Sequence, residues 1–164
     1  MSELGTQSTV EVNRRPIALM GTFPRTLDPK KRLTIPSVWR TALGPEFAYV
    51  LPDVKRGCLR LIPRDTMEAR LAELTAKAAK DPRWREALER VAAAGEPVEF
   101  DVQGRIRIKD PLLAFAKLSG PVELRGSFDV ATIWPREEAK KPVADQLGDV
   151  DKLGEAMDML GFGF

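Results

Sequence analysis

The chain of 164 residues contains no histidine and a single cysteine, Cys58. The lack of histidine excludes the catalytic triads built on it and removes the ligand that most zinc sites use. One cysteine cannot form a disulfide within the chain, which fits a reducing cytoplasm. We therefore expect no metal and no other cofactor, and carboxylates remain the main option for any catalysis.

Long apolar runs are absent as well. No stretch approaches the ~20 apolar residues that span a bilayer, and the first residues lack the apolar core of a secretory signal. With 43% hydrophobic and 30% charged residues, the composition is typical of a globular domain in the cytoplasm. The net charge is only +2, so an argument for nucleic-acid binding must rest on where the charges lie.

One short pattern occurs twice. Residues 27–35 read LDPKKRLTI, and residues 100–108 read FDVQGRIRI. Each copy has an apolar residue, Asp, three turn-forming residues, Arg, and then alternating apolar and polar positions, which predicts a tight β-hairpin. Lys31 stands where the second copy has Gly104, so we expect either a mildly strained backbone at Lys31 or a different turn type.

The two patterns open two longer segments with the same order of elements. A short helix is predicted over residues 37–43 in the first segment and 111–118 in the second, with Ser37 and Asp110 as N-caps. Two apolar strands follow each helix. The repeated unit is therefore β-β-α-β-β, about 45 residues long.

A helical linker is predicted between the two segments. Asp65 and Glu68 have the spacing of a capping box. Asp81, followed by a proline, is predicted to cap a second helix that ends at Gly95. A third helix is predicted to start near Glu137.

These patterns divide the chain into five parts. They are a flexible tail over residues 1–16, a first repeat over 17–64, the helical linker over 65–95, a second repeat over 96–137, and a C-terminal helix or tail over 138–164. The last residues are apolar and interrupted by glycine, so they form either a frayed tail or a docking segment.

This combination resembles the MraZ family of bacterial regulators, which consist of two fused AbrB-like (SpoVT-like) repeats. The resemblance covers about residues 17–140 and rests on the two Asp-x-x-x-Arg hairpins, the Pro-Arg-acidic strand ends and the Asp-Pro restart. It implies a mostly β, α+β fold: a swapped-hairpin β-barrel formed by the two repeats, with inserted and C-terminal helices.

The resemblance also implies a function. Members are sequence-specific DNA-binding transcriptional regulators that are associated with the nucleoid and assemble as rings. They read short direct repeats in the promoter of the division and cell-wall gene cluster. The partners implied are double-stranded DNA and further copies of the chain, with no membrane.

Three positions depart from the family pattern. Lys31 replaces the usual glycine of the first turn, and Lys109 replaces the proline that follows the second strand. Leu113 stands where an arginine is common, at the position that Arg40 holds in the first repeat. The detailed turn geometry and the share of each hairpin in DNA contact stay open, although we expect the first hairpin to dominate.

The basic residues of the two hairpins are the predicted DNA-binding site. They are Arg25, Lys30, Lys31, Arg32, Arg105, Arg107 and Lys109. A two-stranded ribbon fits the major groove, and its cations can contact phosphates or a guanine edge. The alternative is a solvated surface turn. Arg40 either extends this patch or is a solvated helix residue.

Asp28 and Asp101 are predicted to organise the two turns by bonding Arg32 and Arg105, a role that does not prevent either arginine from contacting DNA. Neither aspartate lies in an Asp-Thr/Ser-Gly setting, and both are followed by cations, so we expect no enzyme. The rival function is an antitoxin-like or adaptor barrel that binds a protein partner without independent DNA function.

The remaining distinctive residues are predicted to be structural. Trp39, Trp84 and Trp134 lie on apolar periodic faces, which favours core or subunit packing. Cys58 is predicted to be a buried hydrophobic residue, because no histidine exists to activate it.

Overall fold

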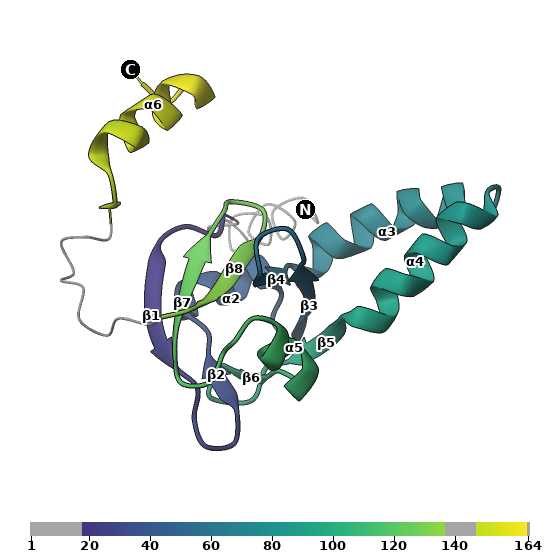
Figure 1. Ribbon diagram of the computed structural model, residues 1–164, viewed down its shortest axis with the longest axis horizontal. Helices are drawn as coiled ribbons and strands as arrows, with labels where there is room; N and C mark the ends of the chain where they lie inside the picture. Colours follow the sequence, from purple (N-terminus) through teal and green to yellow (C-terminus); the bar gives the residue numbers. More distant parts are fainter. Residues whose placement is uncertain (1–17, 137–146, 164) are drawn as a thin grey trace, which may run out of the picture.

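The computed structural model describes residues 18–136 and 147–163 (Figure 1). The first half consists of β1 (Thr22–Thr26), β2 (Arg32–Thr34), α2 (Ser37–Leu43), β3 (Phe47–Asp53) and β4 (Cys58–Ile62). The helices α3 (Arg64–Ala78) and α4 (Pro82–Ala94) follow. The second half consists of β5 (Glu96–Glu99), β6 (Arg105–Arg107), α5 (Asp110–Phe115), β7 (Pro121–Gly126) and β8 (Ala131–Pro135), and α6 (Val150–Leu160) comes last. The predicted α+β class is confirmed.

The strands form two antiparallel ladders. The larger has six strands in the order β1-β7-β8-β4-β3-β5, and the smaller pairs β2 with β6. The same pairing therefore occurs twice: β1 of the first half joins β7 of the second, and β5 of the second half joins β3 of the first. The predicted tight β-hairpins are therefore wrong as strand pairs: each turn forms, but the strands on its two sides lie in different sheets and pair with strands of the other half. Among the described strands, β1 and β5 are the edges of the larger sheet and are not paired with each other. The hydrogen bonds thus leave the sheet open rather than closed into a ring.

The core lies between these ladders and takes side chains from both halves. Strand alternation buries Leu33 of β2 and Ile106 of β6, which lie directly opposite each other. Trp39 of α2 is buried as predicted, and its ring meets the ring of Phe23 edge-on at a centroid distance of 5.2 Å. The indole N–H of Trp39 donates to the carbonyl of Met20 over 2.8 Å, so this buried polar group is satisfied.

The helical linker is confirmed as α3 and α4, which project from the β-structure as a hairpin (Figure 1). Asp81 caps α4 as predicted, since its side chain accepts from the backbone N–H of Arg83. The capping box predicted for α3 is wrong: Pro63 holds the N-cap position with no side-chain bond, and Glu68 pairs instead with Arg64 over 3.3 Å.

This helical hairpin is poorly buried. Ala78 is the one buried side chain of α3, and α4 has none. Trp84 is 39% exposed and carries the Lys77 ammonium 4.8 Å from its ring centroid, so it does not join the core of this chain. Trp134 of β8 is half-buried beneath the guanidinium of Arg125, 4.7 Å from its ring centroid.

The predicted helix over residues 37–43 is confirmed, but both predicted N-caps are wrong. Pro36 and Lys109 hold the cap positions in extended conformations, so Ser37 and Asp110 are the first helical residues. The second helix also ends earlier than predicted, at Phe115, and Lys117 has a positive φ of 58°.

The segment predicted as a C-terminal helix or tail, residues 138–164, contains the helix α6. Asp149 caps it by accepting from the backbone N–H groups of Asp151 and Lys152. The predicted tail over residues 1–16 and the start of a helix near Glu137 lie outside the described residues. None of the described helices has the length and apolar character needed to cross a membrane.

Cys58 of β4 is fully buried, as predicted, and burial raises the pKa of its thiol. Its cross-strand neighbour Asp53 is also buried. Burial raises the pKa of Asp53, but hydrogen bonds from the Arg56 backbone N–H and the Arg60 side chain outweigh this effect, so the pKa is lowered. The charge of the buried Asp53 is therefore balanced by Arg60, which indicates a structural role for this ion pair.

Candidate nucleic-acid interface

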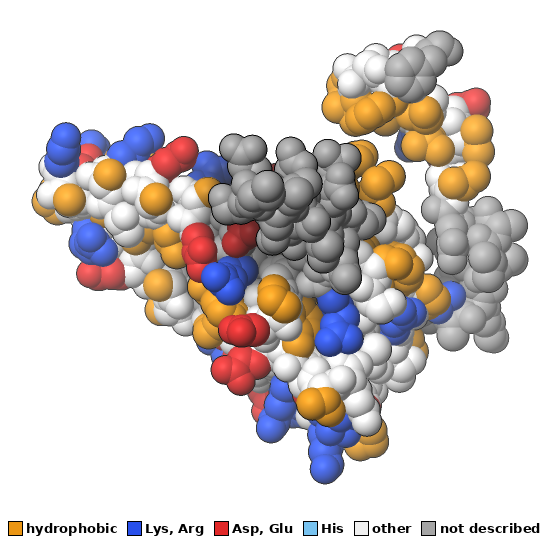
Figure 2. Space-filling model, turned by 180° about the vertical axis from the view of Figure 1, so that it is seen from behind, with side chains coloured by type: hydrophobic (Ala, Val, Ile, Leu, Met, Phe, Trp, Pro, Cys, Tyr) orange, Lys and Arg blue, Asp and Glu red, His pale blue; other side chains and the backbone are white. Residues whose placement is uncertain are grey.

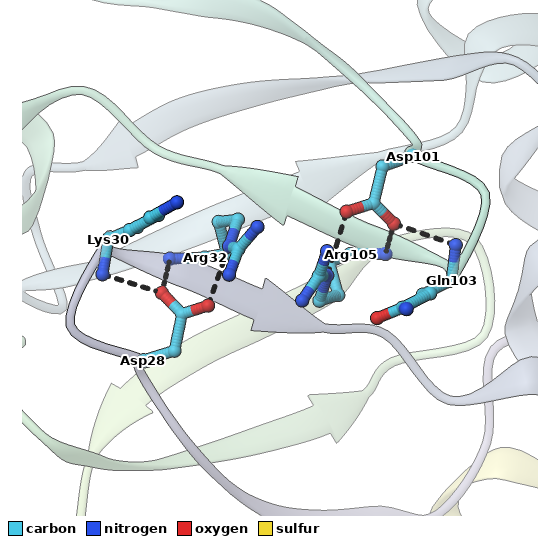
Figure 3. Close-up of polar contacts among 6 residues, drawn as sticks. All are labelled: Asp28, Lys30, Arg32, Asp101, Gln103 and Arg105. Atoms are coloured by element: carbon cyan, nitrogen blue, oxygen red, sulfur yellow. Dashed lines mark hydrogen bonds and ion pairs between the residues drawn. The ribbon is translucent and has the colours of Figure 1, made fainter.

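The first hairpin turn is built around the carboxylate of Asp28. One oxygen accepts from the backbone N–H groups of Lys30 and Arg32 over 2.9 and 2.8 Å, and the other accepts from Arg32 Nε over 2.6 Å (Figure 3). The backbone N–H of Lys31 closes the turn by donating to the Asp28 carbonyl over 2.8 Å. The backbone bond from Arg32 is the largest cause of the lowered pKa of Asp28.

The second turn repeats this arrangement around Asp101. One carboxylate oxygen accepts from the backbone N–H groups of Gln103 and Arg105 over 2.9 Å each, and the other accepts from Arg105 Nε over 2.7 Å (Figure 3). The backbone bond from Arg105 is the largest cause of the lowered pKa of Asp101. The repeated sequence pattern thus encodes a repeated bonding pattern, because every group involved is within four residues along the chain.

The strands that follow the two turns form one ribbon, β2–β6. Its register places Arg32 opposite Arg107 and Thr34 opposite Arg105. Side chains alternate along a strand, so these four residues share the outer face, while the residues between them are buried. In the view of Figure 2, Lys and Arg side chains gather at the lower tip of the molecule, where Figure 1 shows β2, β6 and the turn between β1 and β2.

Arg32 and Arg105 keep donors free although they hold their turns. Each uses Nε for the aspartate, and each side chain is only partly exposed, 32% for Arg32 and 24% for Arg105. A guanidinium has five N–H donors, and the aspartate occupies only the one on Nε. The donors on the two Nη groups of each arginine have no acceptor among the described residues. Arg107 is exposed and has no carboxylate partner in the described part of the chain.

The two turns differ at the position where the sequences differ. Lys31 has a positive φ of 63°, which confirms the expected backbone strain, and its Nζ lies 2.6 Å from Asp110 Oδ1. Gly104 has a φ of 78°, and a Cβ there would lie 2.8 Å from Arg40 Nη1. Arg40 therefore packs its half-buried guanidinium against the second turn.

Each turn thus rests on the helix that follows the other turn. Leu113 stands where Arg40 stands in the first half, and a hollow of about 630 Å³ remains beside the first turn, lined by Leu113, Lys31 and Asp110 among others. Sequence reasoning missed the roles of Arg40 and Asp110. The available signal was that the two halves differ at both positions: Gly104, which leaves room for the Arg40 guanidinium, replaces Lys31, and Leu113 replaces Arg40.

Two predicted residues lie elsewhere. Lys109 is half-buried: its Nζ donates to the Gly95 carbonyl over 3.1 Å, and its backbone N–H donates to Glu96 over 2.7 Å. Arg25 belongs to β1, on the other ladder, where its guanidinium lies 5.6 Å from the ring centroid of Phe23. The ribbon and its turns bring together the other five predicted residues, namely Lys30, Lys31, Arg32, Arg105 and Arg107.

No known family model matches the chain. It is 33% identical to the transcriptional regulator MraZ of Leuconostoc mesenteroides over 84% of this chain and 95% of the relative. Identity is also 33% to the MraZ protein of Caldicellulosiruptor saccharolyticus, over 87% and 99%, and 25% to that of Christiangramia forsetii, over 85% and 92%. With this identity across nearly the full length of its relatives, the chain belongs to the MraZ family of transcriptional regulators.

Proposed function

We propose that this chain regulates transcription by binding double-stranded DNA through the β2–β6 ribbon and its two turns. The observation that carries the proposal is the register of the ribbon, which gathers Arg32, Arg105 and Arg107 on one outer face. A two-stranded ribbon has the width of the major groove, and a guanidinium fork matches both a phosphate and the O6/N7 edge of guanine.

The aspartates support this function by holding the arginines in place. Asp28 and Asp101 fix Nε of Arg32 and Arg105 and leave the Nη groups available to a ligand. An arginine that is already oriented loses less side-chain entropy when it binds. Bonding within the turn and binding to DNA are therefore complementary roles of one residue.

The proposal extends to the assembly. The repeated exchange of partners between the halves supports a swapped-hairpin barrel, and family membership supports a ring-like homo-oligomer in the cytoplasm, associated with the nucleoid. A ring presents many ribbons, so weak contacts to short direct repeats add up on one DNA molecule. The proposed target is the promoter of the division and cell-wall gene cluster.

Arg107→Ala is the sharpest test, because Arg107 is exposed and holds no turn. We expect binding of a promoter duplex with tandem repeats, measured by fluorescence anisotropy, to weaken by about threefold to tenfold. The slope of log affinity against log salt should become shallower by about 0.9, because one phosphate is no longer neutralised by Arg107. A scrambled duplex should bind more weakly than the promoter.

Arg90→Ala is the matched control, since Arg90 is an equally charged, exposed residue of α4, away from the ribbon. Its affinity should equal that of the unchanged protein. If Arg107→Ala and Arg90→Ala behave alike, or if the promoter and the scrambled duplex bind equally, the proposed interface is wrong.

A further inference from the structure

We propose that Asp110 restrains DNA binding by competing with phosphate for Lys31, an inference that rests on the proposed function of the ribbon. The Lys31 ammonium lies 2.6 Å from Asp110 Oδ1, which is the distance of a charge-assisted hydrogen bond. A DNA phosphate that approaches Lys31 must displace this carboxylate or be repelled by it. Asp110 is thus a built-in competitor at the tip of the first hairpin.

The charge of Asp110 acts beyond Lys31. The hydrogen bond from Lys31 is the largest cause of the lowered pKa of Asp110, the charge of Lys31 comes next, and Arg107 also contributes. The carboxylate therefore lies within the field of two predicted DNA-contacting cations. It reduces the positive potential on the side of the ribbon where Arg107 lies.

The fold does not need this ion pair. At the second turn, Gly104 holds the position equivalent to Lys31, and Ser37 of α2 in the first half holds the position equivalent to Asp110. The second turn still forms with the same hydrogen bonds around its aspartate. The side chains of Lys31 and Asp110 are 48% and 69% exposed, and pairs this exposed contribute little to stability. Lys31 also occupies a φ of 63°, a conformation that glycine would adopt without cost.

A strained lysine, kept at a turn beside a carboxylate that the turn does not need, indicates a role outside folding. Without Asp110, the tip would carry Lys30, Lys31 and Arg32 with only the Asp28 carboxylate among them, a charge cluster that binds any DNA. Binding to any sequence is almost entirely electrostatic. The counter-charge keeps this component low, so that contacts made by the ribbon decide which DNA is held.

The test is Asp110→Asn in the full chain, with a random-sequence duplex of about 20 base pairs as the probe. We expect binding to tighten by about fivefold at low salt and the salt slope to become steeper by about 0.9. Glu86→Gln is the matched control, because Glu86 is an exposed carboxylate with an arginine partner on α4 and its change adds the same charge. It should leave affinity unchanged.

A double-mutant cycle tests whether Asp110 acts through Lys31. In a Lys31→Ala background, the gain from Asp110→Asn should fall to that of the Glu86→Gln control. If Asp110→Asn equals Glu86→Gln while Arg107→Ala still weakens binding, this inference fails and the DNA interface stands. If neither the unchanged protein nor Asp110→Asn binds any duplex, both the interface and the inference are wrong.

Discussion

Asp28 and Asp101 hold the turns in their ionised form, so their contribution depends on pH. Hydrogen bonds within each turn lower both pKa values below the ordinary 3.8. Because the folded-state pKa is depressed, the stabilisation is fully present above pH 3.8 and is lost as pH falls through the lower, folded value. We expect Asp28→Asn and Asp101→Asn to destabilise the protein at neutral pH, with the difference from the unchanged protein shrinking in acid.

Urea unfolding followed by circular dichroism, from neutral pH down to about pH 2.5, measures this difference. Glu89→Gln is a suitable control, because Glu89 is exposed and has no hydrogen-bond partner among the described residues. The free energy of unfolding of Glu89→Gln should stay close to that of the unchanged protein over the whole pH range. If the loss of unfolding free energy in the aspartate variants stays constant or grows as pH falls, the charge of the aspartates is not what holds the turns.

For single residues, the sequence could predict contacts within a turn but not contacts between the two halves. The bond between Asp28 and Arg32 follows from the turn pattern, since the two residues are four positions apart. Arg40 packs on Gly104 and Lys31 bonds Asp110 because the halves exchange strands, and no local spacing encodes that meeting. The candidate site was therefore predicted at the turns and missed on the helices.

Helix α4 buries no side chain, so we expect its N-terminal cap to matter more for its stability than it would in a buried helix. The Asp81 carboxylate accepts from the Arg83 backbone N–H over 2.9 Å and satisfies a donor that the helix itself leaves free. We expect Asp81→Ala to lower the free energy of unfolding by about 1 kcal/mol. Hydrogen exchange in the first turn of α4 should rise more than in β4, since the loss is local.

Asp65→Ala in the first turn of α3 is the comparison for this cap. Asp65 makes no capping bond, because Pro63 holds that position, so the expected cost is smaller. Equal losses for the two variants would mean that a general helix-dipole effect, and not the capping bond, is responsible.

Elements with a clear period and a proline or cap were predictable, whereas those interrupted by glycine were not. The period of two identified β2 and β6, and the Asp-Pro restart located α4. The C-terminal segment was predicted only as a helix or a tail, because Gly161 and Gly163 interrupt its apolar last residues. Gly161 does end the helix, with a φ of 82°, but Gly154 lies inside it, with nothing near its α-carbon that a side chain would touch.

At the scale of the whole molecule, the repeat indicated two similar halves but not how they join. Periodicity shows which face of a strand is buried, but it does not name the partner strand. The ladders show that β1 and β2 of the first half pair with β7 and β6 of the second. The halves therefore share one core, and neither hairpin completes its pairing within its own half.

Leu33 and Ile106 test whether this shared core unfolds as one unit. They face each other across the ribbon, with exposures of 0% and 1%, and come from different halves. We expect Leu33→Ala and Ile106→Ala each to lower the free energy of unfolding by about 2–5 kcal/mol, in a single urea transition. The loss in the double variant should differ from the sum of the two single losses by about 0.5 kcal/mol or more, because the two truncations would open one shared cavity.

Val102→Ala gives the background for this comparison, since Val102 sits at the second turn with 98% exposure and should cost almost nothing. Two separate transitions, or a loss confined to one of the two core variants, would contradict a shared core. Because β2 of one half pairs with β6 of the other, a truncation on either strand should lower the free energy of unfolding of both halves together. It should also weaken the strand pairing that places Arg32 opposite Arg107.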